Sequence, residues 1–360
     1  MDNPHINIVT RNFIRLLKCG AYGKMEPLEP MNNFKWLKLI RLSIDQECMG
    51  IAYEGTLRYI NANHITLTDK VCDEWYAVLK KCEDTAILMN SSVSELHNIF
   101  TREPRLYYPV LLRGRGMASF YPNPLHYYCS HIDWYIPTEE KAREADAWAR
   151  REAKITDDTD PNRIKYMYKD VLVENNHFAQ EMHDKRTTDA LQTLITREKS
   201  YYMPNIIRIN GTNVEILPPT INLFVQILYV MQHMIYGSLK PQMIIDLGTL
   251  VRKLGNQIDY IKIERWLNEL KLQKTVDYEG GLLINLFGFK KEELPFMHTY
   301  YEDVSDELVT HIFSDENMHI ESTHSSAKHR KHSSMSKYLN RDAVSNMFAS
   351  IGKLFLTIDD

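Results

Sequence analysis

The segment between residues 107 and 178 constrains the fold of this chain more than any other, because it alternates strand-like and helix-like runs. Its last two strands are joined by a turn at Lys169-Asp170, and residues 157–162 are predicted to form a loop. This order is typical of an α/β or α+β core. The predicted elements are strands at 107–112, 131–136 and twice within 164–178, with helices after Gly116 and at 137–154.

Helical regions flank this core on both sides. Apolar residues recur at three- and four-residue spacing over 32–60 and 68–100, and three more helices are predicted after residue 203. A chain of 360 residues has room for two or three domains, and we expect an α+β fold with a mixed sheet between helical regions. The expected division is a helical domain at 1–105, the core at 106–202, a helical domain at 203–300, and a tail at 301–360 with a polar His- and Ser-rich loop and a terminal helix.

The net charge, the apolar runs and the cysteines of the chain indicate which partners and which compartment to expect. The net charge of −4 gives no general reason to expect binding to nucleic acid or to an acidic membrane. The N-terminus has no basic stretch leading into an apolar core, and the best apolar run, at 221–237, is interrupted by Asn, Gln and His. The five cysteines are scattered without a C-x-x-C spacing, which favours a reducing cytoplasm.

The strand at 131–136 places His131 and Asp133 two residues apart, so both side chains point to the same face. Two carboxylates at this spacing would clamp a divalent cation, and here one of them is replaced by an imidazole. Glu174, on a later strand, is a candidate third ligand. The alternatives are that Asp133 caps a turn or pairs with an arginine, that His131 is a hydrogen-bonded core residue, and that Glu174 is a solvated acid on an edge strand.

Several motifs occur in a fixed order around these residues. They are Arg113-Gly114 at the end of the first strand, Tyr121-Pro122-Asn123-Pro124, Ser130-His131-Ile132-Asp133, Glu174 with His177, and Gln242 with Asp246 in a later helix. Over roughly residues 10 to 300 the chain resembles the bacterial family described as uncharacterised nucleotidyltransferases. Members of that family usually have Lys-Gly, Tyr-Pro-x-Pro, Gly-Asp-Ile-Asp and Glu-x-His at the corresponding places, so the first acid of the family is His131 here.

The resemblance implies a nucleotidyltransferase-like fold and a metal-dependent reaction. A nucleoside monophosphate would pass from a nucleoside triphosphate to an unknown acceptor, which could be a small molecule, a sugar or a protein. Arg113, Gly114 and Gly116 would bind the nucleotide phosphates. Asp133 and Glu174 would be catalytic, and His131, Asp133 and Glu174 would hold Mg²⁺ or Mn²⁺. Imidazole suits Mg²⁺ poorly, so loss of one acidic ligand would impair the site.

A catalytically inactive module that binds a nucleotide or a protein with the same fold is the alternative. A third possibility is a partner protein in a surface-polysaccharide or peptide-modification system. The His-rich stretch in the tail, with His324, His329 and His332, is predicted to be a polar loop rather than a metal site, because Lys and Arg surround it. Nucleic acid is not expected as a partner.

Overall fold

The computed structural model describes residues 6–182, 185–236 and 238–313. Within these ranges the chain forms two compact units, one of residues 81–222 and the other of the residues up to 80 and from 223 onward. The His- and Ser-rich loop and the terminal helix expected in the tail lie outside the described residues.

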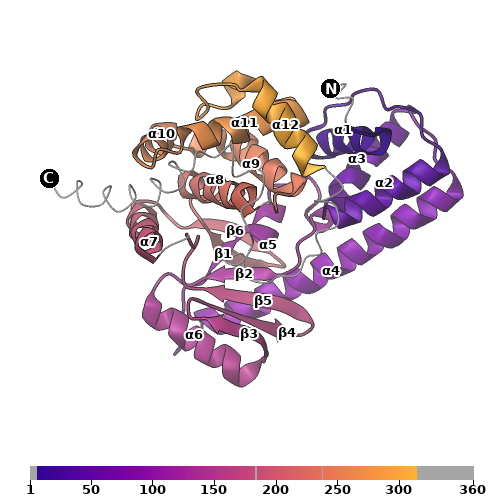
Figure 1. Ribbon diagram of the computed structural model, residues 1–360. Helices are drawn as coiled ribbons and strands as arrows, with labels where there is room; N and C mark the ends of the chain where they lie inside the picture. Colours follow the sequence, from indigo (N-terminus) through magenta and orange to yellow (C-terminus); the bar gives the residue numbers. More distant parts are fainter. Residues whose placement is uncertain (1–5, 183–184, 237, 314–360) are drawn as a thin grey trace. The chain divides into compact units, whose positions relative to one another are not determined.

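The unit of residues 81–222 is built on a seven-stranded mixed sheet in the order β3-β4-β5-β2-β1-β7-β6 (Figure 1). β2 pairs with β5, and β1 with β7, in parallel, while the other neighbouring strands are antiparallel. The α+β class predicted from sequence is confirmed. The strands are β1 (Val110–Leu112), β2 (Ile132–Tyr135), β3 (Lys154–Asp160), β4 (Arg163–Tyr168), β5 (Val171–Asn176), β6 (Asn205–Ile209) and β7 (Thr212–Ile216).

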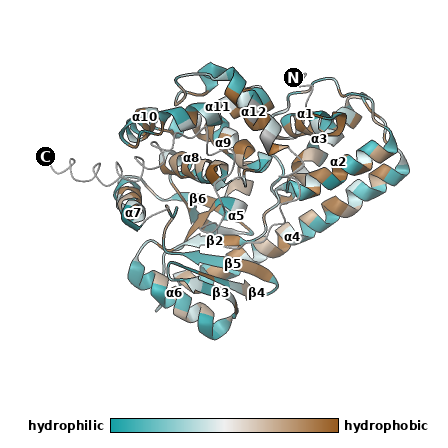
Figure 2. Ribbon diagram, viewed as in Figure 1, coloured by the Kyte–Doolittle hydropathy of each residue, from teal (hydrophilic) through white to brown (hydrophobic). Residues whose placement is uncertain are grey.

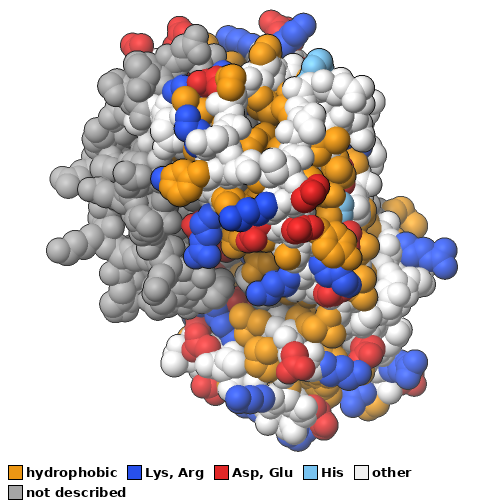
Figure 3. All heavy atoms as spheres, turned by 90° about the vertical axis from the view of Figure 1, so that its right-hand side faces the viewer, with side chains coloured by type: hydrophobic (Ala, Val, Ile, Leu, Met, Phe, Trp, Pro, Cys, Tyr) orange, Lys and Arg blue, Asp and Glu red, His pale blue; other side chains and the backbone are white. Residues whose placement is uncertain are grey.

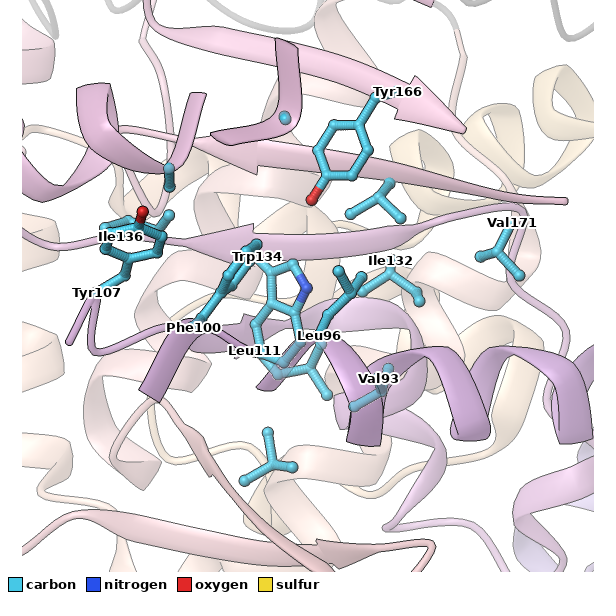
Figure 4. Close-up of a cluster of buried hydrophobic side chains, with 14 of the residues drawn as sticks. Val93, Leu96, Phe100, Tyr107, Leu111, Ile132, Trp134, Ile136, Tyr166 and Val171 are labelled. Carbon is cyan, nitrogen blue, oxygen red and sulfur yellow. The ribbon is translucent and has the colours of Figure 1, made fainter. Parts of the chain in front are cut away.

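One face of the sheet packs against the part of α4 after residue 80 and against α6. Phe100 of α4 makes an edge-to-face contact with Trp148 of α6 at 5.1 Å between ring centroids, within one buried cluster. Figure 4 shows Phe100 in this cluster beside Trp134 of β2. α6 is largely hydrophilic along its exposed side (Figure 2). The helices of this unit are α4 (Asp69–Thr101, in part), α5 (Arg113–Ala118), η1 (Pro124–His126), α6 (Glu139–Glu152) and α7 (Lys185–Ser200).

The opposite face of the sheet contacts α7. Gln192 of α7 hydrogen-bonds to the Tyr135 hydroxyl, and Lys199 Nζ lies 2.6 Å from Glu215 Oε1 on β7. Side chains two residues apart on a strand share a face, so Asp133 of β2 lies on the same side of the sheet as Tyr135. The candidate acids are therefore on this face, opposite the apolar cluster.

Two local expectations are corrected. The segment 157–162, expected as a loop, lies largely in β3, because β3 pairs with β4 in an irregular ladder. The chain after residue 203, expected to be helical, first forms the β6–β7 hairpin, which turns at Asn210-Gly211 with positive φ angles of 46° and 81°. This hairpin belongs to the sheet, so the core extends past residue 202. The turn at Lys169-Asp170 is confirmed, with φ of 47° and 64°.

The second unit is helical. α1 and α3 approach closely at two glycines, since a Cβ on Gly20 would lie 1.9 Å from the Ile51 carbonyl oxygen, and one on Gly55 would lie 2.1 Å from that of Leu16. No helix within the described ranges combines the length and the apolar character needed to cross a membrane. The helices of this second unit are α1 (Ile8–Tyr22), α2 (Asn33–Asp45), α3 (Met49–Asn61), α8 (Pro219–Tyr236, from residue 223), α9 (Pro241–Leu254), η2 (Gly255–Gln257), α10 (Tyr260–Glu269), α11 (Gln273–Phe287), η3 (Lys291–Glu293) and α12 (Glu302–Ile312), together with the start of α4.

Glu279 of α11 is a buried acid whose two carboxylate oxygens have no hydrogen-bond partner among the described residues. Burial raises the pKa of Glu279 well above its ordinary value. In the unfolded chain a glutamate ionises with a pKa of about 4.3, so below that pH the burial of Glu279 costs the protein no stability through ionisation. Above it, the free energy of unfolding falls by about 1.4 kcal/mol per pH unit until the pH reaches the folded-state pKa of Glu279.

We therefore expect Glu279→Met to raise the melting temperature more at about pH 8 than at about pH 5. Thermal unfolding followed by circular dichroism at both pH values measures this difference. The exposed Glu292→Met is the control and should show no such dependence. An equal gain at both pH values for Glu279→Met would mean that folding does not raise the pKa of Glu279.

Candidate functional site

Polar side chains from three neighbouring strands meet on the face opposite the apolar cluster. Asp133 of β2 pairs in register with Glu174 of β5, and Glu174 pairs with Lys165 of β4. Residues directly opposite each other on adjacent strands have neighbouring side chains. The sheet therefore forms a row of Asp133, Glu174 and Lys165, and the next row places Asn176 beside Arg163.

His131 lies immediately before β2 and points toward both acids. Its Nε2 is 3.3 Å from Asp133 Oδ2 and 3.8 Å from Glu174 Oε1, and its Nδ1 is 2.9 Å from the Ser130 hydroxyl. One ligand atom from each of the three residues lies within 4.8 Å of the others. The structure thus brings together the three residues that the strand spacing and the family resemblance singled out.

The charges around Asp133 favour its ionised form. Burial alone would raise the pKa of Asp133, but the charge and hydrogen bond of His131, then Arg113 and Asn176, outweigh it and hold this pKa well below its usual range. Arg113 Nε lies 3.7 Å from Asp133 Oδ2, and Asn176 Nδ2 donates to Asp133 Oδ1 at 3.4 Å. The alternative in which Asp133 pairs with an arginine thus describes part of its environment.

The same contacts act on the imidazole in the opposite sense. Burial alone lowers the pKa of His131, but the Asp133 carboxylate, through its charge and hydrogen bond, and the Glu174 carboxylate raise it to about 8. Without a metal ion the ring is therefore largely protonated at neutral pH and forms ion pairs with the two acids. A metal ion at His131 would have to displace this proton.

Glu174 has cations of its own. Lys165 Nζ lies 2.6 Å from Glu174 Oε1, and Arg163 Nη1 lies 3.9 Å from Glu174 Oε2, while Arg163 Nη2 lies 3.6 Å from Asp160 Oδ2 at the end of β3. Neither Lys165 nor Arg163 was among the residues singled out from sequence. Counting back from the turn at Lys169-Asp170 places Lys165 opposite Glu174. The register of this hairpin could therefore have identified Lys165 from the sequence.

The turn after β1 brings Arg113 toward the acids. Arg113 and Gly114 both have positive φ, of 30° and 41°, and a Cβ on Gly114 would lie 3.4 Å from the His131 carbonyl oxygen. Glycine is favoured there because a side chain would combine backbone strain with close contact to the chain before β2. Arg113 Nη1 also donates to Gln180 Oε1 at 3.1 Å. This turn orients the guanidinium between Asp133 and the segment after β5.

Gly116 has a different environment. A Cβ there would lie 3.4 Å from the Leu111 carbonyl oxygen and 3.5 Å from Ile216 Cγ2, so the residue packs closely against β1 and β7. Its neighbour Arg115 is buried and donates to Asn90 Oδ1 and to the carbonyl oxygens of Pro124 and Tyr127. Arg115 thus anchors the chain at the end of the Tyr-Pro-Asn-Pro motif, and Gly116 lies against β1 and β7.

His177 is not part of the cluster. Its Nε2 lies 2.8 Å from Asp146 Oδ2 on α6, the helix on the apolar face, and both side chains are buried. Asn176 instead occupies the position two residues after Glu174 and bonds to Asp133. Gln242 and Asp246 lie on α9 of the helical unit.

The donor set can be tested against a divalent cation. Two carboxylates and one imidazole, with ligand atoms within 4.8 Å of one another, fit a single ion. Imidazole nitrogen favours Mn²⁺ over Mg²⁺. Lys165 at 2.6 Å already neutralises one oxygen of Glu174, so the set offers little negative charge for a second divalent ion.

A mixed sheet with a glycine turn after its first strand, an acid on the next strand and another on a later, parallel strand agrees with the arrangement that the resemblance to nucleotidyltransferases implies. A family model described as uncharacterised nucleotidyltransferase matches residues 32–288, and the chain belongs to this family. No curated protein and no solved structure matches the chain.

Proposed function

We propose that the protein transfers a nucleoside monophosphate from a nucleoside triphosphate to an acceptor, with Mn²⁺ or Mg²⁺ as cofactor. In this reaction an acceptor atom attacks the α-phosphorus and the bond to the bridging oxygen breaks. Pyrophosphate then leaves, and the acceptor loses its proton. The observation that supports this most is the convergence of His131, Asp133 and Glu174 beside the Arg113-Gly114 turn.

The residues of the cluster would have two roles, binding the metal ion and binding the nucleotide phosphates. Asp133 and Glu174, with His131, would hold the ion, which when bound would supply positive charge against the phosphoryl oxygens and the leaving pyrophosphate. Arg113 would bind a phosphate oxygen through its guanidinium, which recognises such oxygens by paired N–H donors. Gly114 would leave the backbone beside the phosphates free of a side chain.

The acceptor is proposed to be a small molecule, a sugar or a protein. On the face drawn in Figure 3, acidic and basic side chains are interspersed, in keeping with the net charge of −4. Such a surface does not favour a polyanion as acceptor. A cytoplasmic location is proposed because all five cysteines are free thiols.

The test uses nucleoside triphosphates labelled at the α-phosphate, MnCl₂ or MgCl₂, and a cell extract as the source of acceptor. We expect label to enter an extract component with equimolar release of pyrophosphate, and EDTA to abolish both. Binding of an α,β-methylene triphosphate, measured by calorimetry, gives a readout independent of the acceptor. Absence of both binding and transfer would refute the proposal.

One observation favours the alternative of an inactive binding module. Each carboxylate of the cluster already has a protein cation near it, Arg113 for Asp133 and Lys165 for Glu174. A cluster balanced in this way can persist without metal, and Arg113 can still bind a phosphate oxygen. Binding of the α,β-methylene triphosphate without pyrophosphate release from the hydrolysable nucleotide would select this alternative.

We expect Arg113→Ala to weaken binding of the α,β-methylene triphosphate by about 2 kcal/mol, or roughly thirtyfold, because a charge-assisted contact to phosphate is lost. Calorimetry at constant ionic strength measures this change. Arg102→Ala, at an exposed position near the end of α4, is the matched control for loss of one positive charge. Equal affinities of the parent and Arg113→Ala would remove Arg113 from the nucleotide site.

A further inference from the structure

Lys165 lies within the cluster rather than at its margin. Its Nζ is 2.6 Å from Glu174 Oε1, and the same Glu174 oxygen is 3.8 Å from His131 Nε2. The side chains of Lys165 and Glu174 are only 10% and 6% exposed. The ammonium group therefore occupies the side of Glu174 that faces the shared ligand position.

An ion pair between the turn of the same hairpin and α4 gives a comparison for this placement. Lys169 and Glu95 form an ion pair of the same length, 2.6 Å, but their side chains are 59% and 43% exposed. Exposed pairs contribute little to stability, whereas a buried charge requires a partner to offset its loss of hydration. Lys165 is thus a buried cation whose nearest anion is one of the three candidate metal ligands.

The charge of the donor set agrees with this placement. With His131 at the first position of the acid motif, the set contributes two carboxylates, and Lys165 neutralises one of them. A second divalent ion at Glu174 would meet the ammonium group at close range, where repulsion is strong because the site is shielded from water. One divalent ion would meet less repulsion.

We propose that Lys165 takes the place of a second divalent cation, so that the site binds one divalent ion and uses the ammonium group as its other positive charge. This inference rests on the proposed function. Lys165 acts through Glu174 and is a positioning residue, holding the carboxylate and fixing how many ions the site accepts.

The experiment titrates Mn²⁺ into the metal-free protein, without nucleotide and with saturating α,β-methylene ATP, and counts the bound ions by electron paramagnetic resonance. We expect the parent complex to bind one protein-dependent Mn²⁺ and Lys165→Met to bind two. We also expect Lys165→Met without nucleotide to bind Mn²⁺ at least about tenfold more tightly, because one nearby positive charge is gone. The double variant Lys165→Met, Glu174→Gln should return to one ion.

Two variants separate this role from a structural one. Lys169→Met removes the same charge from the exposed pair and should leave the Mn²⁺ count and affinity unchanged. Lys165→Arg keeps the charge and should bind one ion, like the parent. If Lys165→Met does not fold, the count in the parent still tests the proposal, because two ions there would contradict it.

Two Mn²⁺ ions in the parent complex, or an unchanged count and affinity in folded Lys165→Met, would overturn the role of Lys165 and leave the proposed function standing. A parent that binds neither Mn²⁺ nor the nucleotide would instead overturn the proposed function.

Discussion

Asp133→Asn should lower the rate of pyrophosphate release by about a thousandfold, because it removes the negative charge that lies beside both His131 and Arg113. Asparagine has nearly the same shape, and its amide oxygen can still accept the hydrogen bond from Asn176. The fold should therefore persist while the charge that holds a cation is lost. Pyrophosphate release with the extract acceptor, together with circular dichroism, measures both effects.

Asp146→Asn is the matched control for this variant. Asp146 is also buried and also pairs with a histidine, but it lies on α6, on the apolar face of the sheet. Its substitution should lower the melting temperature and leave the turnover number unchanged. If Asp133→Asn turns over as fast as the parent, Asp133 has no part in the reaction, and the cluster is an ion-pair network alone.

The row of Asp133, Glu174 and Lys165 shows what the sequence can predict about this site. The two-residue period of a strand places His131 and Asp133 on one side. The turn at Lys169-Asp170 fixes the register of β4 against β5, and so determines which residue faces Glu174. Both are local rules, and both hold in the structure.

The parts that sequence reasoning missed depend on pairing between strands. β7 pairs in parallel with β1 across about a hundred residues of chain, so the apolar pattern after residue 203 did not reveal the β6–β7 hairpin. The ladder between β3 and β4 is local, since only residues 161–162 separate the two strands, but it likewise turns a polar segment into a strand. Pairing with a neighbouring strand outweighs the local preference of polar residues for loops.

The directions of two arginines and of His177 show a related limit of prediction from sequence. Arg115 and Arg113 are two residues apart around the same glycine turn, yet one anchors a loop through carbonyl oxygens and the other faces an acid. His177 pairs with Asp146 on the opposite face from Glu174. The direction of each side chain depends on backbone angles at the turn and at the strand end, which residue types alone do not determine.

His131→Asp should raise the affinity for Mg²⁺ at least about a hundredfold. The substitution replaces a largely protonated imidazole, whose pKa is raised to about 8, by a carboxylate. The cluster thus gains an oxygen ligand and loses a positive charge, and both changes favour a hard divalent ion. The parent should prefer Mn²⁺ to Mg²⁺, and the variant should lose most of that preference.

The same substitution should destabilise the metal-free protein by about 3 kcal/mol, because the ion pair of His131 with Asp133 is replaced by repulsion between carboxylates. Mg²⁺ should restore this loss, since an ion that binds only the folded state raises its melting temperature. Thermal unfolding with and without MgCl₂ therefore reports both effects in one experiment.

His131→Asn separates the two causes, since it removes the imidazole without adding a carboxylate. If the gain in Mg²⁺ affinity arises from a completed acid pair, it must appear in full with aspartate and only in part with asparagine. A metal-free His131→Asp that is destabilised but not rescued by Mg²⁺ would show that the position before β2 does not face a cation. His131 would then be a hydrogen-bonded core histidine, and the cluster would belong to the binding module.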